Sequence, residues 1–446
     1  MEENRSVTKD ETEEKRFRNI WKAVHCSVAM FICESAGNSV ANIMSQTFSD
    51  NGFESLGFIV LGLFYGGLAV SAIFAPKIIH KFGVSKSMAL GCTLESFWVF
   101  PLIFVTMKSQ TAWYTSDSAI YLLNILCSLL SGIGASLIWI GQGKYISDCA
   151  TPSSKGFYFG LFWAIYMASL IFGNAISAVI LEYYTLKTFY LIMYGFFWAA
   201  IILFYNLRKP IKLSTNLVTK EITKQVSITE EVKELFKFMV GKKMLYLLPT
   251  VAWTGISIGV YSGLFTPIIT ESIEGDLEEN EKLSKAFTAM IFLGIGEIVG
   301  GLVIGQVIDK IGNKLASLIS FVSIIVQTVA LMLYIETNNY GLLTFVMTFA
   351  WGFQDSVINT HLQETLGFEF EDNVKAYSAF NFIQCMTVFI SLNTETLLTS
   401  KLTLQIFLIA VNIFGLLAII LNMRFPYSCH VNTPYLAQEL RTLINN

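Results

Sequence analysis

The stretch GQVIDKIGNK, residues 305–314, lies between two long apolar segments and fits the pattern G-x-x-x-D-[RK]-x-G-x-[RK]. A related stretch, PKIIHKFGVSK, residues 76–86, stands 229 residues earlier between two other apolar segments, with a histidine in place of the aspartate. Glycines allow a tight turn, and an acidic side chain can pair with basic residues and helix ends nearby. The motif positions are Gly305, Asp309, Lys310 and Gly312 in one copy, and His80 and Gly83 in the other. Two copies in register predict a duplicated chain.

The composition indicates a membrane protein. Of the 446 residues, 54% are hydrophobic and 14% are charged, whereas soluble domains carry about 25% charged residues. A bilayer-spanning helix needs about 20 apolar residues, and twelve segments reach this length. They lie at about 23–48, 56–75, 87–107, 118–140, 157–181, 188–207, 243–270, 285–308, 314–335, 340–360, 374–398 and 403–423. We expect an all-α integral membrane protein with twelve transmembrane helices as two six-helix bundles.

A charged segment divides the predicted spans six and six. It contains apolar residues at helical spacing, and Ser227 with Glu230 has the spacing of a capping box, so we expect a short amphipathic helix there. That helix would lie on the inner membrane surface or pack against the helix ends. The predicted units are an N-terminal tail (1–22), an N-terminal bundle (23–207), a linker (208–242), a C-terminal bundle (243–423) and a C-terminal tail (424–446).

The distribution of Lys and Arg predicts the orientation, because basic residues are retained in short cytoplasmic loops. The side that holds both termini carries 25 of the 30 Lys and Arg residues. The opposite side carries Lys108, Lys187, Lys282, Lys285 and Lys401. We therefore expect both termini in the cytoplasm, in a chain of the plasma membrane or of an endomembrane.

Several classes of function are disfavoured. The seven cysteines are spread singly, and no Cys or His arrangement has ligand spacing, so no metal site and no cofactor are expected. His25 and His361 lie near predicted span ends and are typical of interfacial side chains. The chain has no basic soluble domain for nucleic acid, and no pattern indicates an enzyme.

A block rich in glycine and aromatic residues runs from residue 132 to residue 174, and small residues let helix backbones approach closely in a membrane. Its distinctive positions are Gly132, Gly134, Trp139, Gly141, Gln142, Gly143, Lys144, Tyr145, Gly156, Gly173 and Asn174. This block resembles the signature of the uncoordinated-93-like family, ion channel regulatory proteins of the major facilitator fold. The six-plus-six arrangement and the segment 305–314 also resemble the major facilitator superfamily, from which His80 departs. The resemblance implies a regulatory subunit of a potassium channel or an escort of a receptor.

Four carboxyl groups lie inside predicted spans, where a charge is costly and therefore marks a candidate site: Glu34, Glu95, Glu297 and Asp355. The superfamily resemblance implies that the first, fourth, seventh and tenth spans line a central cavity, and polar residues form stripes on all four. The candidate cavity residues for an ion, a proton or a substrate are Glu34, Asn38, Asn42, Asn124, Ser131, Thr254, Tyr261, Asp355 and Asn359. A packing network of protonated acids is the alternative for Glu34 and Asp355.

The other two acids have different expectations. Glu297 lies among glycines, which favours a close-packed contact between helices over a site. Glu95 lies on the third span, which is peripheral in this fold. A lateral contact with a partner protein and a packing role are equally compatible with that position.

Two functions compete. The sequence favours a membrane adaptor that binds a channel or receptor laterally and controls its gating, assembly or trafficking. The alternative is a secondary transporter in which Glu34 and Asp355 couple proton or cation movement to alternating access. Both predict the lipid bilayer as surroundings; the first requires an integral-membrane partner and the second a small solute or ion.

Overall fold

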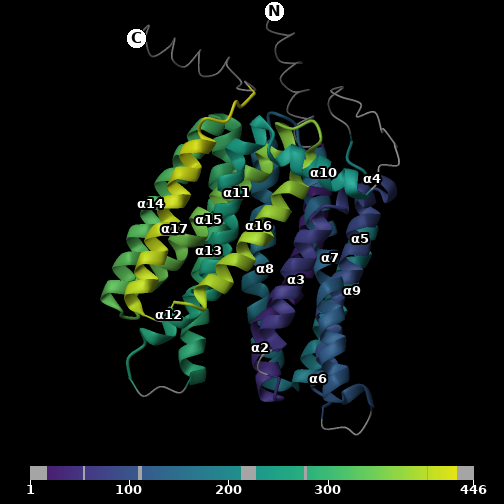
Figure 1. The fold of residues 1–446 in the computed structure, drawn as a ribbon, viewed down its shortest axis with the longest axis vertical. Coiled ribbons are helices and arrows are strands. Elements are labelled where there is room, and N and C mark those ends of the chain that lie inside the picture. The colour runs from purple at the N-terminus through teal and green to yellow at the C-terminus, as the bar shows by residue number, and fades with distance from the viewer. Residues whose placement is uncertain are drawn as a thin grey trace, which may run out of the picture.

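The computed structural model describes residues 18–53, 56–108, 113–211, 228–275, 279–398 and 400–428, and their regular secondary structure is helical throughout (Figure 1). Most of each predicted tail and residues 212–227 of the predicted linker lie outside these residues. The first group of helices is α2 (Ile20–Asp50), α3 (Leu56–Ala72), α4 (Ala75–Phe82), α5 (Val84–Glu95), η1 (Ser96–Trp98), α6 (Phe100–Val105), η2 (Trp113–Thr115), α7 (Asp117–Cys149), α8 (Lys155–Tyr183) and α9 (Leu186–Tyr205). The others are α10 (Ile228–Met239), α11 (Lys242–Gly263), α12 (Phe265–Glu271), α13 (Glu279–Lys310), α14 (Asn313–Thr337), α15 (Leu342–Phe368), α16 (Asn373–Glu395) and α17 (Lys401–Asn422).

Each predicted span coincides with a helix or with consecutive helices. Within the described part of the chain, eight helices are long and apolar enough to cross a membrane, or nine if a bent pair is counted as one span. Helices α2, α15 and α16 fall outside this count. All three carry acidic, amide and hydroxyl side chains, which lower their apolarity.

Two predicted spans are broken in the structure. The third consists of α5, η1 and α6, and Pro101 occupies the first turn of α6, where its missing N–H costs no helical hydrogen bond. The seventh consists of α11 and α12, which are separated at Leu264. The fourth is longer than predicted, since α7 continues to Cys149.

The two motif segments between the apolar spans are mostly helical and are not loops. Helix α13 continues through Asp309 to Lys310, and the N-terminal copy forms the short helix α4, bent by 62° from α3. The turns themselves lie at Gly83 and Gly312, whose φ angles of 82° and 110° favour glycine. The glycine prediction holds at the two positions where the chain reverses.

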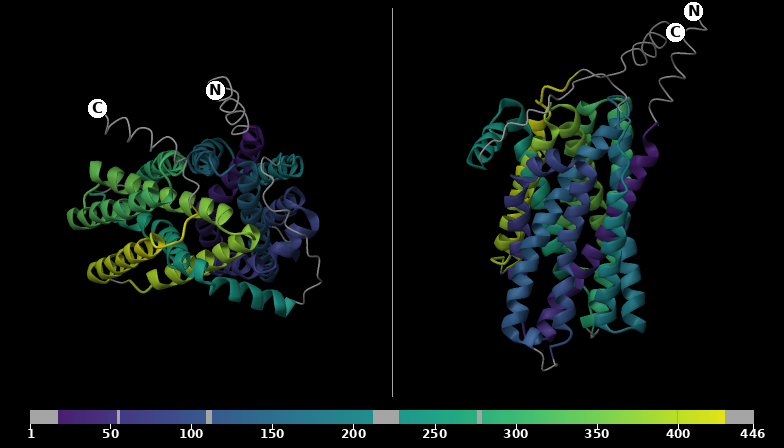
Figure 2. Two further views of the ribbon diagram at one scale, coloured as in Figure 1. Left: turned by 90° about the horizontal axis from the view of Figure 1, so that it is seen from above. Right: turned by 90° about the vertical axis from the view of Figure 1, so that its right-hand side faces the viewer.

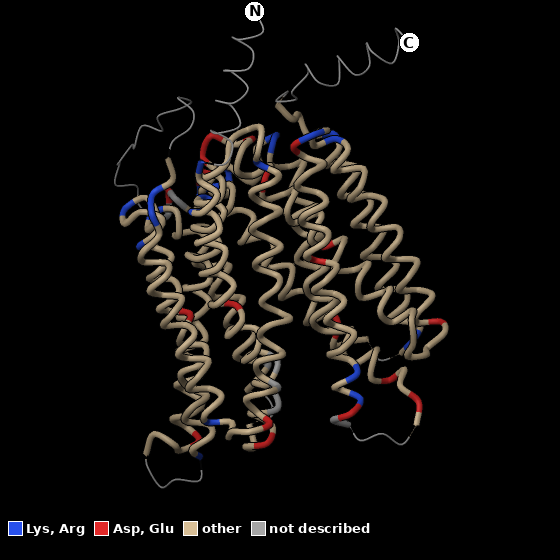
Figure 3. Tube along the Cα trace, turned by 180° about the vertical axis from the view of Figure 1, so that it is seen from behind, with Lys and Arg blue, Asp and Glu red and all other residues tan. Residues whose placement is uncertain are grey.

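Several helix ends meet at one end of the molecule, which we call the basic end. The Asn19 side chain, just before α2, donates to the carbonyl oxygens of Cys149 at 3.2 Å and Ile211 at 2.9 Å. After α17, the Tyr427 hydroxyl lies 3.3 Å from the His361 imidazole on α15. Lys and Arg gather at this end, as Figure 3 shows. The start of α2 and the end of α17 therefore face the same side.

The helices form two groups, and the pattern of inter-helix contacts positions the site. Helices α2 to α9 lie on one side and α11 to α17 on the other (Figure 2), and they diverge away from the basic end (Figure 1). Helix α8 packs on α13, while α3 and α7 pack on α16. The α8–α13 contact is glycine-lined: a β-carbon on Gly156 would lie 2.2 Å from the carbonyl oxygen of Gly305. Only small residues permit this approach.

The predicted amphipathic helix is α10, which lies across the basic end (Figure 1). Leu235 and Met239 are buried, and the Phe236 ring packs 5.8 Å from the Phe382 ring of α16. This favours packing against the helix ends over lying free on the membrane surface. Ser227, half of the predicted capping box, lies outside the described residues.

Candidate functional site

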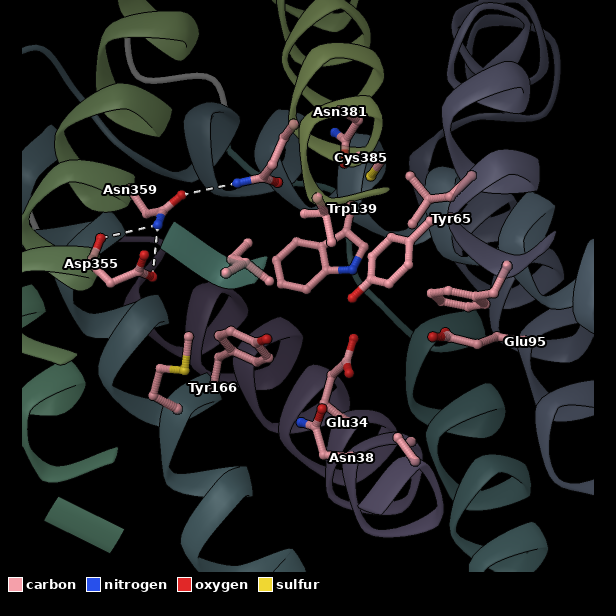
Figure 4. A pocket seen from close by; sticks show the side chains of 18 of the residues that line it. Glu34, Asn38, Tyr65, Glu95, Trp139, Tyr166, Asp355, Asn359, Asn381 and Cys385 are labelled. Carbon is pink, nitrogen blue, oxygen red and sulfur yellow. Dashed lines mark hydrogen bonds between the residues drawn. The ribbon is translucent and has the colours of Figure 1, made fainter. Parts of the chain in front are cut away.

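A cavity of about 210 Å³ lies between the two groups of helices (Figure 4). Both groups supply its walls, from helices α2, α3, α5, α7, α8, α11, α15 and α16. Of the predicted cavity residues, it is lined by Glu34, Asn38, Tyr261, Asp355 and Asn359. The residues that sequence reasoning did not assign to it include Tyr65, Glu95, Trp98 and Gln363.

Glu34 contributes a buried carboxyl group without a described partner to this cavity. Its carboxyl points from α2 into the space between Tyr65, Trp139 and Tyr166 (Figure 4). Only 8% of the residue is exposed, and the described residues offer it neither a hydrogen bond nor an ion pair. One turn along α2, the amide nitrogen of Asn38 is buried without a described partner as well. The carboxyl of Glu34 and the amide nitrogen of Asn38 are therefore available to bind a molecule or ion that enters the cavity.

Asp355 faces the cavity from the other group, and its orientation is held by hydrogen bonds. Ser257 Oγ donates to one carboxyl oxygen at 2.7 Å and Asn359 Nδ2 donates to the other at 2.9 Å. Ser257 in turn accepts from the Trp351 indole at 3.1 Å, and Gln384 donates to Asn359 at 3.3 Å. The network fixes one carboxyl geometry before any ligand binds.

Glu95 contradicts the expectation of a lateral partner contact. The residue is 5% exposed and its side chain lines the cavity rather than the periphery. Cys33 Sγ lies 3.4 Å from its Oε2 and donates to it. Glu95 is the last residue of α5, directly before the break in the third span.

Glu297 agrees with the expected close-packed contact. It is fully buried on α13 and accepts a hydrogen bond of 2.8 Å from the Trp163 indole of α8. A β-carbon on Gly352 would approach the Glu297 backbone nitrogen to 3.1 Å, so α13 and α15 are in tight contact here. Its carboxyl also lies close enough to Asp355 to interact with it. Glu297 thus connects the helix contact to the cavity wall.

Three predicted cavity residues, Asn124, Ser131 and Thr254, do not line it in the structure. Asn124 donates to the Ile120 carbonyl at 2.8 Å, and Ser131 donates to the Cys127 carbonyl at 2.8 Å. Thr254 lies one layer back, where it accepts from Gln384 at 3.0 Å. The Asn42 side chain lies outside those that the structure describes. A polar stripe on a helix therefore predicts cavity-lining residues only coarsely, since serine, threonine and asparagine side chains also donate hydrogen bonds to backbone carbonyls of their own helix.

Aromatic side chains form much of the wall. The Trp139 and Tyr166 rings meet edge to face at 5.1 Å, and the Trp163 ring lies 5.6 Å from Tyr166. Tyr65 and Trp98 complete the wall from α3 and η1. In an apolar helix such residues resemble lipid-facing or core side chains, so the sequence did not predict them as cavity residues.

The glycines of the signature block bring helices into contact. A β-carbon added to Gly132 would lie 2.2 Å from the Phe64 carbonyl oxygen, and one added to Gly134 would lie 2.3 Å from the Gly91 carbonyl oxygen. At Gly141 and Gly143 the added β-carbon would lie 2.6 Å from the Met88 Cγ and from the Tyr377 ring, respectively. At Gly173 it would lie 2.7 Å from the Ser35 carbonyl oxygen. Helix α7 therefore approaches α3, α5 and α16 through three faces. This is the packing role that small residues have in membranes.

The other signature residues have mixed surroundings. Gln142 is fully buried on α7, and neither of its side-chain amide atoms has a described partner. Lys144 pairs with Asp148, and the Tyr145 hydroxyl donates to the Arg208 carbonyl at 2.6 Å. Asn174 is half-buried on α8.

Only the C-terminal copy of the motif makes a described capping contact between the two helix groups, and the equivalent residue of the N-terminal copy does not. Asp309 accepts the backbone N–H groups of Gly156 at 2.8 Å and Phe157 at 2.9 Å, so it caps the start of α8. In the other copy His80 is exposed. The start of α16 is instead capped from its own side by Asp372, which accepts from the Lys375 N–H at 3.0 Å. Lys310 is exposed.

Further contacts close the basic end between the groups. Lys155 forms a buried ion pair with Glu364, and the Ser147 hydroxyl donates to the Gly367 carbonyl at 3.0 Å. Lys155 is the first residue of α8, the helix whose start Asp309 caps. We call the contacts of Asp309, Lys155 and Ser147 across the groups the latch.

The model of the family described as ion channel regulatory protein UNC-93 matches residues 51–423. The chain belongs to the UNC-93 family. It is 23% identical over 397 residues to the UNC93-like protein MFSD11 of Xenopus tropicalis, and this match covers 80% of this chain and 85% of that protein. It is 22% identical over 419 residues to protein unc-93 homolog A of Xenopus laevis, covering 82% and 85%. The resemblance seen in the sequence is confirmed.

Solved structures show that this UNC-93 family member has the major facilitator fold. The proton:xylose symporter XylE matches with a TM-score of 0.70 at 13% identity, covering 92% of this chain and 95% of that one. The transporter FucP in its outward conformation matches with a TM-score of 0.64 at 14% identity, covering 91% and 97%. The chain is thus an integral membrane protein, whose helices lie in the lipid bilayer.

Proposed function

We propose that this chain is a secondary transporter that couples movement of a cation or proton to alternating access. Its twelve membrane-spanning helices form two six-helix bundles, residues 23–207 and 243–423, which are joined by the cytoplasmic linker 208–242. The tails, 1–22 and 424–446, lie in the cytoplasm of a cell whose plasma membrane or endomembrane carries the protein. The asymmetric distribution of Lys and Arg supports this orientation.

One observation carries the proposal: carboxyl groups from both bundles face a common cavity without a counter-ion. Glu34 and Glu95 come from the first bundle and Asp355 from the second, and none of the described lining residues is Lys or Arg. An ionised carboxylate in a membrane interior is costly unless a cation compensates it. The cavity therefore suits a bound cation or a transferred proton.

The arrangement supports different roles for Asp355 and Glu34. Asp355, held by Ser257 and Asn359, provides a fixed anchor, whereas Glu34 is free to accept a proton or a cation. The latch holds the two groups together at the basic end, and the groups diverge toward the opposite end (Figure 1). Breaking the latch while the other ends of the bundles approach would expose the same site to the cytoplasm.

Flux measurements test the proposal. Purified protein in proteoliposomes is assayed for K⁺, Na⁺ and proton movement with ion-sensitive dyes. We expect Glu34→Gln and Asp355→Asn each to reduce the cation-driven signal by roughly tenfold or more, because each removes a compensating charge. The matched control is Glu395→Gln, a buried acid of α16 that does not line the cavity. No flux above empty liposomes, or flux that survives both cavity substitutions, would refute the transporter.

A regulatory or trafficking adaptor is the second candidate, and two observations favour it. The matched family is described as ion channel regulatory, and the exposed His80 lacks the capping contact that Asp309 makes. An adaptor needs an integral-membrane channel or receptor as partner. Stoichiometric co-purification of such a protein from native membranes in mild detergent, unaffected by Glu34→Gln, would support the adaptor. The cavity is the feature that an adaptor leaves unexplained.

A further inference from the structure

We propose that the central cavity takes a small organic cation, an ammonium group carrying short alkyl substituents, as its substrate. The inference rests on the proposed transport function and names the class of cation. It follows from what surrounds the unpartnered carboxyl of Glu34, from the kinds of side chain in the wall and from the size of the space.

The wall offers aromatic faces rather than a shell of oxygen ligands. Its aromatic residues are Phe64, Tyr65, Trp98, Trp139, Trp163, Tyr166 and Tyr261. Aromatic ring faces attract cations within about 6 Å of the ring centre, and desolvated sites strengthen this attraction. In contrast, the described residues contain no group of three or more His, Cys, Asp or Glu placed to hold a metal ion. Hard inorganic cations need such converging oxygens.

Glu34 supplies the charge that an ammonium group needs. The residue is more than nine-tenths buried, has no described partner and points into the aromatic wall (Figure 4). Around it, Tyr65, Trp139 and Tyr166 present rings from three different helices. A carboxylate beside several rings matches a cation whose surface is partly apolar, since alkyl groups gain from contact with the rings while the charge is compensated.

The volume limits the size of this cation. At about 210 Å³, the cavity is smaller than the roughly 300 Å³ at which drug-sized binding sites begin. Choline and tetramethylammonium are compact probes of the expected kind. The amide groups of Asn38 and Asn359, which also line the cavity, suit a hydroxyl on such a molecule.

Equilibrium binding tests the proposal without requiring transport. The purified full chain in detergent is titrated with choline, with its neutral isostere 3,3-dimethyl-1-butanol and with K⁺, and binding is followed by calorimetry and thermal shift. We expect choline to bind roughly tenfold or more tightly than the isostere, because only choline carries charge for Glu34 and the rings.

Substitutions separate charge from packing. Glu34→Gln is expected to weaken choline binding by roughly tenfold, and Trp139→Leu by several-fold, whereas Trp139→Phe keeps a ring and most of the affinity. Glu395→Gln is the matched control and leaves binding unchanged. Gel-filtration profiles confirm that each variant is folded, and Trp139→Phe keeps the test informative if Trp139→Leu aggregates.

The outcomes are distinguishable. Equal affinity for choline and its isostere, or choline affinity unchanged by both Glu34→Gln and Trp139→Leu, would overturn the substrate class. If K⁺ or proton flux depends on Glu34 and Asp355 while choline fails to bind, the substrate class is wrong and the transporter stands. If choline binds as expected but neither labelled choline nor K⁺, Na⁺ or protons cross the membrane of the proteoliposomes, the organic cation site stands and the transporter is wrong.

Discussion

At the scale of single residues, glycines set how closely the helices approach. Gly132 faces the Phe64 carbonyl oxygen so closely that an added β-carbon would lie 2.2 Å from it. We expect Gly132→Ala to lower stability by about 1–3 kcal/mol, the usual cost of overpacking, because backbone must move. Thermal unfolding of the purified protein measures the effect.

The matched control for this substitution is Gly195→Ala on α9, where no atom lies within 4 Å of the added β-carbon. Alanine is a better helix former, so this variant should be unchanged or more stable by about 0.5–1 kcal/mol. Similar losses in both variants would show that the Gly132 contact is looser than the structure indicates.

At the scale of helices, the two copies of the motif have different tasks. Asp309 caps α8 across the helix groups, whereas His80 is exposed and Asp372 caps α16 locally. We expect Asp309→Ala to destabilise the start of α8 by about 0.5–2 kcal/mol, the usual value of a lost cap. Hydrogen exchange of residues 155–160 is the measurement.

His80→Ala at the equivalent place should leave the exchange of the first turn of α16 unchanged, while Asp372→Ala should accelerate it. The contrast separates a cap that joins the two groups from one that serves only its own helix. Faster exchange at α16 in His80→Ala would mean that the duplicated contact survives in both halves.

At the scale of the whole molecule, the buried Lys155–Glu364 pair joins the two groups at the basic end. Removal of one partner leaves an uncompensated buried charge, so Lys155→Met should cost about 3–5 kcal/mol. The double variant Lys155→Met, Glu364→Gln should recover a large part of this loss. The partly exposed Lys144–Asp148 pair is the control, and its loss should cost about 0.5 kcal/mol or less.

Thermal unfolding measures all three variants, and the flux assay tells what the pair does for function. Under the proposed transport function, a weakened latch should shift the protein toward the conformation open at the basic end and alter the measured flux at unchanged expression. If the single and double variants lose the same stability, the two side chains do not act as a pair.

The sequence alone determined the fold class and the family. Runs of apolar residues predicted spans that coincide with helices, because burial in lipid acts on each segment independently, although the polar side chains of α2, α15 and α16 leave these three below the apolarity of a spanning helix. The motif Gly305 to Lys314 and the glycine block were also local signals. Glu34 and Asp355 were recognisable as candidates, since a carboxyl group in an apolar segment is costly wherever it packs.

Only the tertiary structure decided which side chains share a site. Tyr65, Glu95 and Trp98 line the cavity because α3, α5 and η1 turn those side chains inward, whereas Asn124 and Thr254 bond elsewhere despite equally suitable spacing. The cap made by Asp309 on α8 joins residues more than 150 positions apart. Such relations depend on how helices rotate and cross, which is set by side-chain packing over the whole molecule and leaves no local trace in the chain.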